Sequence, residues 1–148
     1  MDLLPITDLA IQQEDYEAVK TLLNYGFIVS TGQLELAAKT KENAIQLIKY
    51  NKENNGLDDS GNPTFYDDKY SKFDQIQQLL TQHYNANVIN DINGFTNLRQ
   101  GRNTTSAIVA TIKSGEHIKV LDNTNPWYHV ESMAGNEGYI YHSKIKSL

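Results

Sequence analysis

The side chains that could carry out chemistry are few and scattered. The four histidines, His83, His117, His129 and His142, lie far apart, and none belongs to a His-Glu-x-x-His or similar metal-ligand spacing. The chain has no cysteine, which excludes a thiol nucleophile and a thiolate zinc site. It also lacks a Gly-x-x-x-x-Gly-Lys-Ser/Thr phosphate loop and a Gly-x-Ser-x-Gly nucleophile turn. We therefore expect a protein that is not an enzyme and that uses no cofactor.

The polar loop at residues 51–62 is the best candidate for a metal site. It is rich in turn formers, and an Asp-x-Ser-x-Asn run begins there at Asp58. A calcium-binding loop that begins in this way needs glycine at its sixth position and glutamate at its twelfth. This sequence has Pro63 and Lys69 at those positions, so we expect no metal.

The acidic residues are concentrated in the first part of the chain. Residues 1–86 hold thirteen acids and seven lysines, a net charge of −6, whereas residues 87–148 hold five acids and six bases, a net charge of +1. An acidic surface repels the phosphates of nucleic acids and attracts a basic protein. We predict that a basic partner would bind the acidic side chains Glu14, Asp15, Glu17, Asp58 and Asp59. The alternative is that these charges only keep a small domain soluble.

Apolar residues in the first part of the chain recur at helical spacing. Two short helices separated near Glu14 and Asp15 are expected, with Thr7 or Asp8 as the N-cap of the first. Gly26 would end the second helix, because glycine accepts the left-handed conformation of a helix C-terminus. The expected unit is a helical hairpin.

The hairpin pattern recurs. The Leu-Ala pair at 36–37 lies 27 residues after the Leu-Ala pair at 9–10, and residues 73–80 repeat the apolar spacing of the second helix. Self-similarity at such a period is typical of solenoids. The pattern resembles degenerate ankyrin repeats, with Asn-Pro-Thr-Phe at 62–65 in place of the Thr-Pro-Leu-His turn, although the period is shorter than the ~33 residues of that family. A plain bundle of four to six helices is the alternative for residues 1–86.

From Val88 onward the pattern becomes that of strands. β-Branched and aromatic residues alternate with polar ones, and turn signals recur about every ten residues. The turns are expected at Asn93-Gly94, Ser114-Gly115, Asn123 to Pro126 and Ala134 to Asn136. Five short strands of this kind predict a small barrel over residues 87–148.

Four motifs in this second part resemble those of bacterial SH3-like domains. They are Asn97-Leu98-Arg99-x-Gly101, Gly115-x-x-Ile118-x-Val120, Trp127-Tyr128-x-Val130 and Gly138-Tyr139-Ile140. The resemblance covers about Ile92 to Leu148 and departs from the family at Arg102, where the family has proline. Together the two resemblances imply an α+β fold of two modules, ankyrin-like helical hairpins followed by an SH3-like β-barrel. The second also implies that Arg99 braces the barrel and that an aromatic-lined groove binds peptides or peptidoglycan.

The resemblance makes four aromatic side chains candidates for that groove, namely Phe95, Trp127, Tyr139 and Tyr141. Successive side chains of a strand point to opposite faces. If Val130 and Ile140 face the core, the tryptophan and both tyrosines therefore face outward, where aromatic rings favour recognition. The alternative is that these rings cap the barrel or pack against the helices.

The start of the chain does not read as a secretory signal. Met1 to Asp8 is acidic and is interrupted by Pro5, and no later run approaches the ~18 apolar residues of a membrane span. We expect a cytoplasmic protein that binds neither nucleic acid nor membrane. The favoured function is a protein-binding module, in concrete form an immunity protein that occludes an interbacterial toxin. The alternatives are a cell-envelope module that binds peptidoglycan or peptides, and a barrel that only caps the helical array.

Overall fold

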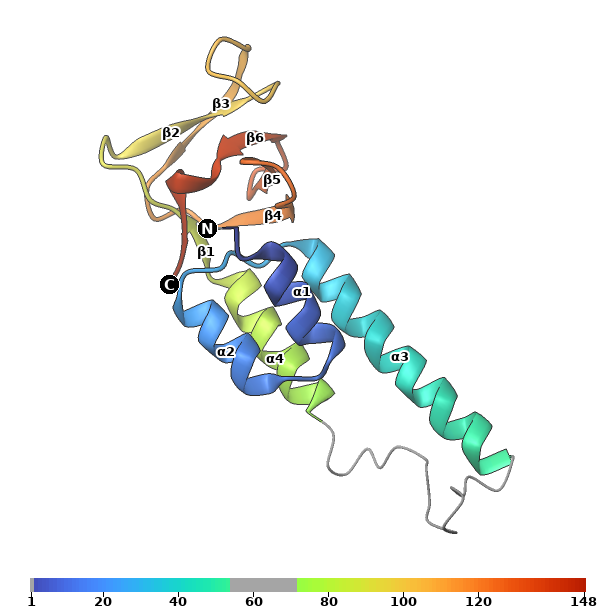
Figure 1. The fold of residues 1–148 in the computed structure, drawn as a ribbon. Helices are drawn as coiled ribbons and strands as arrows, with labels where there is room; N and C mark the ends of the chain where they lie inside the picture. Colours follow the sequence, from blue (N-terminus) through green and yellow to red (C-terminus); the bar gives the residue numbers. More distant parts are fainter. Residues whose placement is uncertain (1, 54–71) are drawn as a thin grey trace.

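The computed structural model describes residues 2–53 and 72–148, in which a helical part and a barrel are stacked end to end (Figure 1). The helices are α1 (Leu4–Gln12), α2 (Tyr16–Asn24), α3 (Thr31–Glu53) and α4 (Phe73–Asn85). The strands are β1 (Asn87–Ile89), β2 (Phe95–Arg99), β3 (Ile108–Lys113), β4 (Ile118–Asp122), β5 (Trp127–Ser132), β6 (Glu137–Tyr141) and β7 (Ile145–Ser147), with a 3₁₀ turn, η2, at His142–Lys144. No helix in the described ranges is long and apolar enough to cross a membrane.

The strands pair antiparallel in two sheets. Five strands have the order β3-β2-β6-β5-β4, and β1 pairs with β7 in a separate two-stranded sheet. The five predicted strands correspond to the larger sheet, while β1 and β7 add the smaller one. The predicted turns at Gly94, Gly115 and Gly135 are present, and each of these glycines has a positive φ. The predicted change from helix to strand near residue 86 is also present, whereas the division into two domains there stays a prediction.

The first two helices form the predicted hairpin, separated at residues 13–15, but the first helix starts earlier than expected. The prediction that Thr7 or Asp8 caps it is wrong, because the helix begins at Leu4 and both residues lie inside it. Pro5 sits in the first turn, where a missing N–H costs no hydrogen bond, and Asp2 Oδ1 accepts the Leu4 N–H at 3.0 Å. The second helix ends at Asn24, before Gly26 as expected.

The second predicted hairpin is absent from residues 31–53, so the described residues do not show the ankyrin-like arrangement. Residues 31–53 form one continuous helix, α3, whose second half extends past the other helices in Figure 1. The segment between the two expected helices, Ala38 to Asn43, contains neither glycine nor proline, so nothing in it stops helix propagation. The Asn-Pro-Thr-Phe turn at 62–65 lies outside the described residues. The described part of the helical module is a four-helix arrangement, the plainer alternative.

The described residues form two hydrophobic cores, and the α2–α3 connection contributes to both. Phe27 and Val29 pack into the helical core with residues such as Leu80, whereas Ile28 packs into the barrel core with residues such as Val120. Side chains that alternate in this way are typical of an extended segment. The connection therefore joins the helical part to the barrel through side chains on both sides.

Buried polar groups reinforce this junction. The Asn123 Nδ2 group, in the β4–β5 turn, donates to Ile28 O at 2.9 Å and to Gln33 Oε1 at 3.0 Å. Gln33 Oε1 also accepts the Ser30 N–H at 2.8 Å and the Ser30 hydroxyl at 2.7 Å. From the far side, Asn87 Nδ2 donates to Val29 O at 2.9 Å. The unpaired polar groups of an irregular connection are thus satisfied by side chains from the barrel and from α3.

Candidate functional site

The outer face of β5 and β6 carries the predicted aromatic side chains. Trp127 pairs with Tyr141 and His129 pairs with Tyr139 in the antiparallel register. Val130 and Ile140 are buried in the barrel core, as strand parity predicted for side chains of the opposite face. Trp127, Tyr139 and Tyr141 therefore lie outside the core.

Three of the four predicted aromatic residues line one groove. Phe95 from β2, Trp127 from β5 and Tyr141 from β6 surround a cavity of about 560 Å³. The rings of Trp127 and Tyr141 meet edge to face, with centroids 5.5 Å apart and planes at 65°. Phe95 is 46% exposed and Tyr141 is 40% exposed, so much of their ring surface is open to a ligand. We call this cavity the aromatic groove.

Tyr139, the fourth predicted aromatic residue, is not part of the groove lining. Its ring stacks on that of His129, with centroids 5.2 Å apart and planes at 29°, and the Arg102 guanidinium lies 5.0 Å from its centroid. His129 Nε2 in turn lies 3.2 Å from Glu137 Oε2. Tyr139 is thus already covered on its faces by side chains of the barrel itself, which leaves less of it for a ligand.

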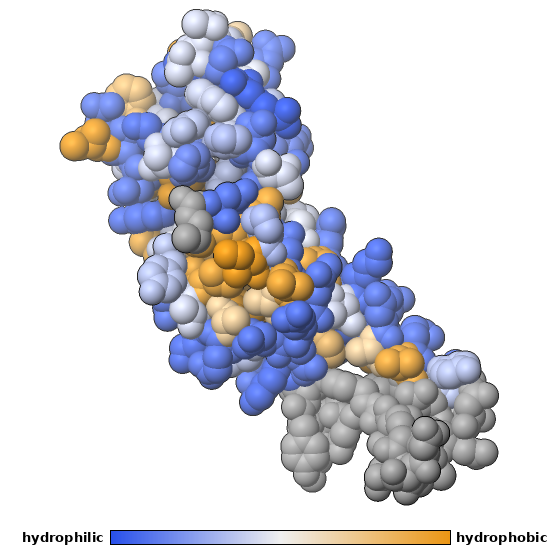
Figure 2. Space-filling view, viewed as in Figure 1, coloured by the Kyte–Doolittle hydropathy of each residue, from blue (hydrophilic) through white to orange (hydrophobic). Residues whose placement is uncertain are grey.

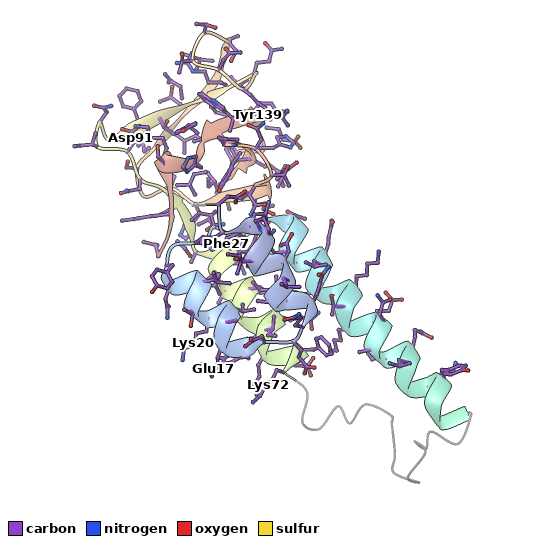
Figure 3. The ribbon with its side chains drawn as sticks, in the orientation of Figure 1. Glu17, Lys20, Phe27, Lys72, Asp91 and Tyr139 are labelled. Atoms are coloured by element: carbon purple, nitrogen blue, oxygen red, sulfur yellow. The ribbon has the colours of Figure 1, made fainter. Side chains whose placement is uncertain are left out.

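Polar residues close one end of the aromatic groove. Lys144 Nζ lies 3.3 Å from Asp91 Oδ2, and the Asn93 N–H donates to Asp91 Oδ1 at 2.9 Å. The hydrogen bond from the Asn93 backbone and then the Lys144 ammonium hold the pKa of Asp91 below its usual value. Figure 3 shows Asp91 and Tyr139 on separate parts of the barrel. The ion pair is thus part of the groove lining, whereas Tyr139 is not.

Arg99 forms part of the groove wall and braces the barrel. Its Nη1 donates to Ser106 O at 3.0 Å across the β2–β3 loop, and it also lines the groove beside Asn97. The bracing role implied by the family resemblance is therefore present. The guanidinium has five donors, so one bond to Ser106 leaves others for a ligand carbonyl or carboxylate.

The predicted acidic partner face is largely engaged within the protein. Asp15 Oδ1 caps α2 by accepting the Ala18 N–H at 3.1 Å, and the Glu14 carboxylate accepts the Lys72 N–H. Glu17 is exposed, and Figure 3 shows it with Lys20 and Lys72 at the end of the helical part away from the barrel. Asp58 and Asp59 lie outside the described residues. The acidic surface here is therefore interspersed with lysines and partly used for capping.

The histidines form no common site. Among residues 2–53 and 72–148, no three His, Asp or Glu side chains lie close enough to hold a metal ion. His83 is partly buried, which lowers its pKa, and His117 Nδ1 lies 3.1 Å from Asn85 O. His142 lies against the Tyr128 ring at the helical end of the barrel. Each histidine has a different local environment and none faces another in the described part of the chain.

Sequence reasoning missed Asp91 and Lys144, two polar residues of the groove. Asp91 and Lys144 flank the barrel at opposite ends of its sequence, and no local pattern joins them. The Asn93-Gly94 turn was expected, and an aspartate just before such a turn commonly binds the turn's backbone. That signal could have located Asp91 but not its partner Lys144.

Most of the barrel and the aromatic residues of its groove fall in the part of the chain that matches a known family of domains. Residues 94–146 match the family model of the bacterial SH3 domain, and they include β2 to β6 and every aromatic residue of the groove. The C-terminal part of the chain is thus a bacterial SH3-like barrel. The helical part lies outside this match. No curated protein shows a significant sequence match to the chain.

Proposed function

We propose that this chain is a non-catalytic binding module whose aromatic groove holds an extended peptide. The observation that carries the proposal is the convergence of Phe95, Trp127 and Tyr141, from three different strands, around one cavity. Aromatic rings that are partly exposed supply large contact area at low entropic cost, which is why they dominate recognition sites. A shallow groove of this kind suits an extended chain better than a compact metabolite.

The polar residues of the groove fit the backbone of such a peptide. Arg99 and Asn97 supply donors and acceptors beside the rings, and the Asp91–Lys144 pair closes one end. Apolar surface with a few placed polar groups gives affinity from the rings and orientation from the hydrogen bonds. The bacterial SH3 match supports a peptide of a protein or of peptidoglycan as the ligand class.

Binding to purified peptidoglycan and to its isolated stem peptides tests the proposal. We expect the full chain to sediment with purified sacculi or to bind a stem peptide. The Phe95→Ala variant should bind about tenfold more weakly, because truncating an anchor residue at a recognition site costs more than about 1 kcal/mol of binding free energy. Ile108→Ala is the matched control, because Ile108 is a similarly exposed apolar residue of the barrel outside the groove. Equal binding by both variants, or no binding to either material, would contradict the proposal.

We also propose a second candidate, a basic protein partner bound by the helical part in the cytoplasm. The observation that favours it is an apolar area over α1 and α2, bordered by hydrophilic surface (Figure 2), to which α1 contributes Ile6 and Leu9, each 50% exposed. Exposed apolar residues inside a charged rim are typical of protein interfaces. In its concrete form this partner is a toxin, which the chain would neutralise by occlusion.

The dependence of binding on salt concentration distinguishes the two proposed functions. A partner held by the acidic helical surface should be recovered in stoichiometric amount at low ionic strength and be lost as salt screens the charges. Leu9→Ser should abolish its recovery, while Phe95→Ala should leave it unchanged. Recovery that is insensitive both to salt and to Leu9→Ser would exclude the helical surface.

A further inference from the structure

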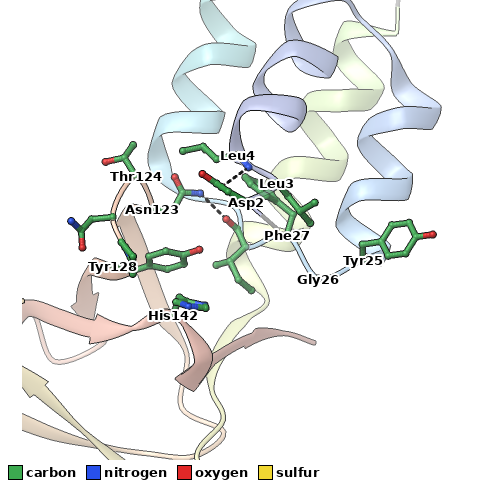
Figure 4. A pocket seen from close by; sticks show the side chains of 13 residues that line it. Asp2, Leu3, Leu4, Tyr25, Gly26, Phe27, Asn123, Thr124, Tyr128 and His142 are labelled. Carbon is green, nitrogen blue, oxygen red and sulfur yellow. Dashed lines mark hydrogen bonds between the residues drawn. The ribbon is translucent and has the colours of Figure 1, made fainter. Parts of the chain in front are cut away.

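A second cavity, of about 490 Å³, lies where the helical part meets the barrel (Figure 4). One wall comes from the start of the chain and the α2–α3 connection, including Asp2, Leu3 and Phe27. The other wall comes from the barrel, including Tyr128 and His142. We call it the junction pocket. It is distinct from the aromatic groove, because the two cavities share no lining residue.

The barrel wall of the junction pocket is aromatic. The Tyr128 and His142 rings have centroids 6.0 Å apart and are tilted by 37°. Tyr128 follows Trp127 in β5, so the two side chains point to opposite faces of the strand. Trp127 therefore lines the aromatic groove and Tyr128 lines the junction pocket. In the described part of the chain the Tyr128 hydroxyl has no hydrogen-bond partner. Figure 4 shows the Tyr128 ring pointing toward the helical wall.

The helical wall is apolar with one carboxylate at its edge. Leu3 and Leu4 are half-buried and Phe27 is buried, so they form a hydrocarbon surface. Asp2 is exposed, and its Oδ1 accepts the Leu4 N–H at 3.0 Å, which offsets the positive end of α1. Its negative charge lies close enough to Tyr128 to add to burial in raising the pKa of that phenol. Tyr128 therefore stays neutral at physiological pH, and Asp2 is the one acidic side chain among the described residues that line the pocket.

We propose that the junction pocket binds an alkylammonium group, the chemistry of a lysine side chain. The ammonium would lie between the Asp2 carboxylate and the face of the Tyr128 ring, which attracts cations. Its N–H groups suit the carboxylate and the free oxygen of Tyr128 as acceptors. The alkyl stem would lie along Leu3 and Phe27, as lysine stems commonly pack on apolar surface. An anion of the same length would be repelled by the charge of Asp2 and should bind more weakly.

A titration followed by NMR tests this inference on the full chain. The probes are pentylammonium, the uncharged 1-pentanol and the anion pentanoate, which share one alkyl chain and differ in charge. Among these three probes we expect pentylammonium to bind most tightly, with saturable shifts at Leu3, Phe27 and Tyr128. Nα-Acetyl-lysine N-methylamide is a fourth probe, and comparison with pentylammonium distinguishes a lysine of a protein from a free amine as the source of the group.

Two variants test whether the Asp2 carboxylate recognises the charge of the ammonium group. The Asp2→Asn variant keeps an oxygen that accepts the Leu4 N–H and removes the charge, so it should fold normally. It should bind pentylammonium about fivefold more weakly, because a partly exposed ion pair contributes about 1 kcal/mol to binding. Glu137→Gln removes an exposed carboxylate elsewhere on the barrel and should leave the affinity unchanged. Equal binding of pentanol and pentylammonium, an unchanged affinity in Asp2→Asn, or no saturable shift at the pocket would each overturn the proposal.

Discussion

The side-chain amide of Asn123 donates to the main-chain carbonyl of Ile28 at 2.9 Å, and this bond ties the β4–β5 turn of the barrel to the α2–α3 connection. Asn123 is buried, as is its second acceptor Gln33. Asn123→Ala would leave both acceptors without this donor, and we expect a loss of about 1 to 3 kcal/mol in the free energy of unfolding. Urea denaturation measures it. The exposed Asn90→Ala should change the same quantity by less than about 0.5 kcal/mol, and an equal effect of the two variants would refute the role of Asn123.

The shared connection also predicts that the helices and the barrel unfold together. Trp127 is the single tryptophan and lies in the barrel, so its fluorescence reports on that part, while circular dichroism at 222 nm reports on the helices. Because Ile28 belongs to the barrel core while its neighbours belong to the helical core, we expect the two transitions to coincide in urea. Two separated transitions would show that the parts are independent.

Gly138 lies where β6 passes closest to β2. A Cβ atom at this position would lie 2.6 Å from the Arg99 carbonyl oxygen and 2.8 Å from Leu98 Cγ, both closer than van der Waals contact. We expect Gly138→Ala to destabilise the fold by about 3 kcal/mol, as severe overpacking does. Gly135→Ala is the control, since nothing lies within 4 Å of its added atom and only the left-handed conformation, at a cost of about 1 kcal/mol, opposes it. Thermal unfolding compares the two variants, and Gly138→Ala should have the lower Tm. A lower Tm for Gly135→Ala would contradict the steric argument.

The lowered pKa of Asp91 predicts a dependence of stability on pH. A carboxyl group whose pKa is lower in the folded state stabilises the fold above its ordinary pKa of 3.8, and that contribution is lost as the pH falls from 3.8 through the folded-state value. Urea denaturation of the wild type and of Asp91→Asn between pH 2 and pH 6 should show a shallower loss for the variant below about pH 4. If the free energies of unfolding of the two proteins changed in parallel over this pH range, Asp91 would contribute nothing to the pH dependence of stability.

Asp15 distinguishes a capping role from a partner-binding role. It caps α2, so Asp15→Ala should cost about 1 kcal/mol in the free energy of unfolding, whereas Asp15→Asn, with an equally good cap, should cost almost nothing. Chemical denaturation of both variants checks this. If a basic partner exists and uses the charge of Asp15, Asp15→Asn should weaken its binding while leaving stability intact. Equal stability of the Ala and Asn variants would argue against the cap.

The features that sequence predicted well are those set by local rules. Strand parity put Val130 and Trp127 on opposite faces of β5, and the burial of Val130 then leaves Trp127 outside the core. The helix stop before Gly26 follows from the conformation that glycine allows. The barrel motifs were equally local, since each falls within a strand or the turn beside it. These signals predicted the α+β class and, among four candidate aromatic residues, the three that line the groove.

The features that sequence could not predict depend on distant contacts or on the absence of a signal. The repeat pattern suggested a second hairpin, but apolar periodicity alone does not show where a helix stops, and α3 simply continues past Asn43. Tyr139 shares the parity of Tyr141, yet His129 and Arg102 cover it, because they come from other parts of the barrel. The junction pocket combines Asp2 with Tyr128, and no sequence pattern joins residues so far apart.

The pairing of β1 with β7 has a consequence for how the chain is made. β1 directly follows α4, but its partner strand β7 comes after all five strands of the larger sheet. A nascent chain exposes the unpaired edge of β1 while the strands from β2 to β6 are translated, at about 5 to 20 residues per second. The helices could therefore fold on the ribosome several seconds before the barrel closes. During that interval Ile28 lacks its barrel neighbours, and a chaperone that shields apolar segments would find its target there.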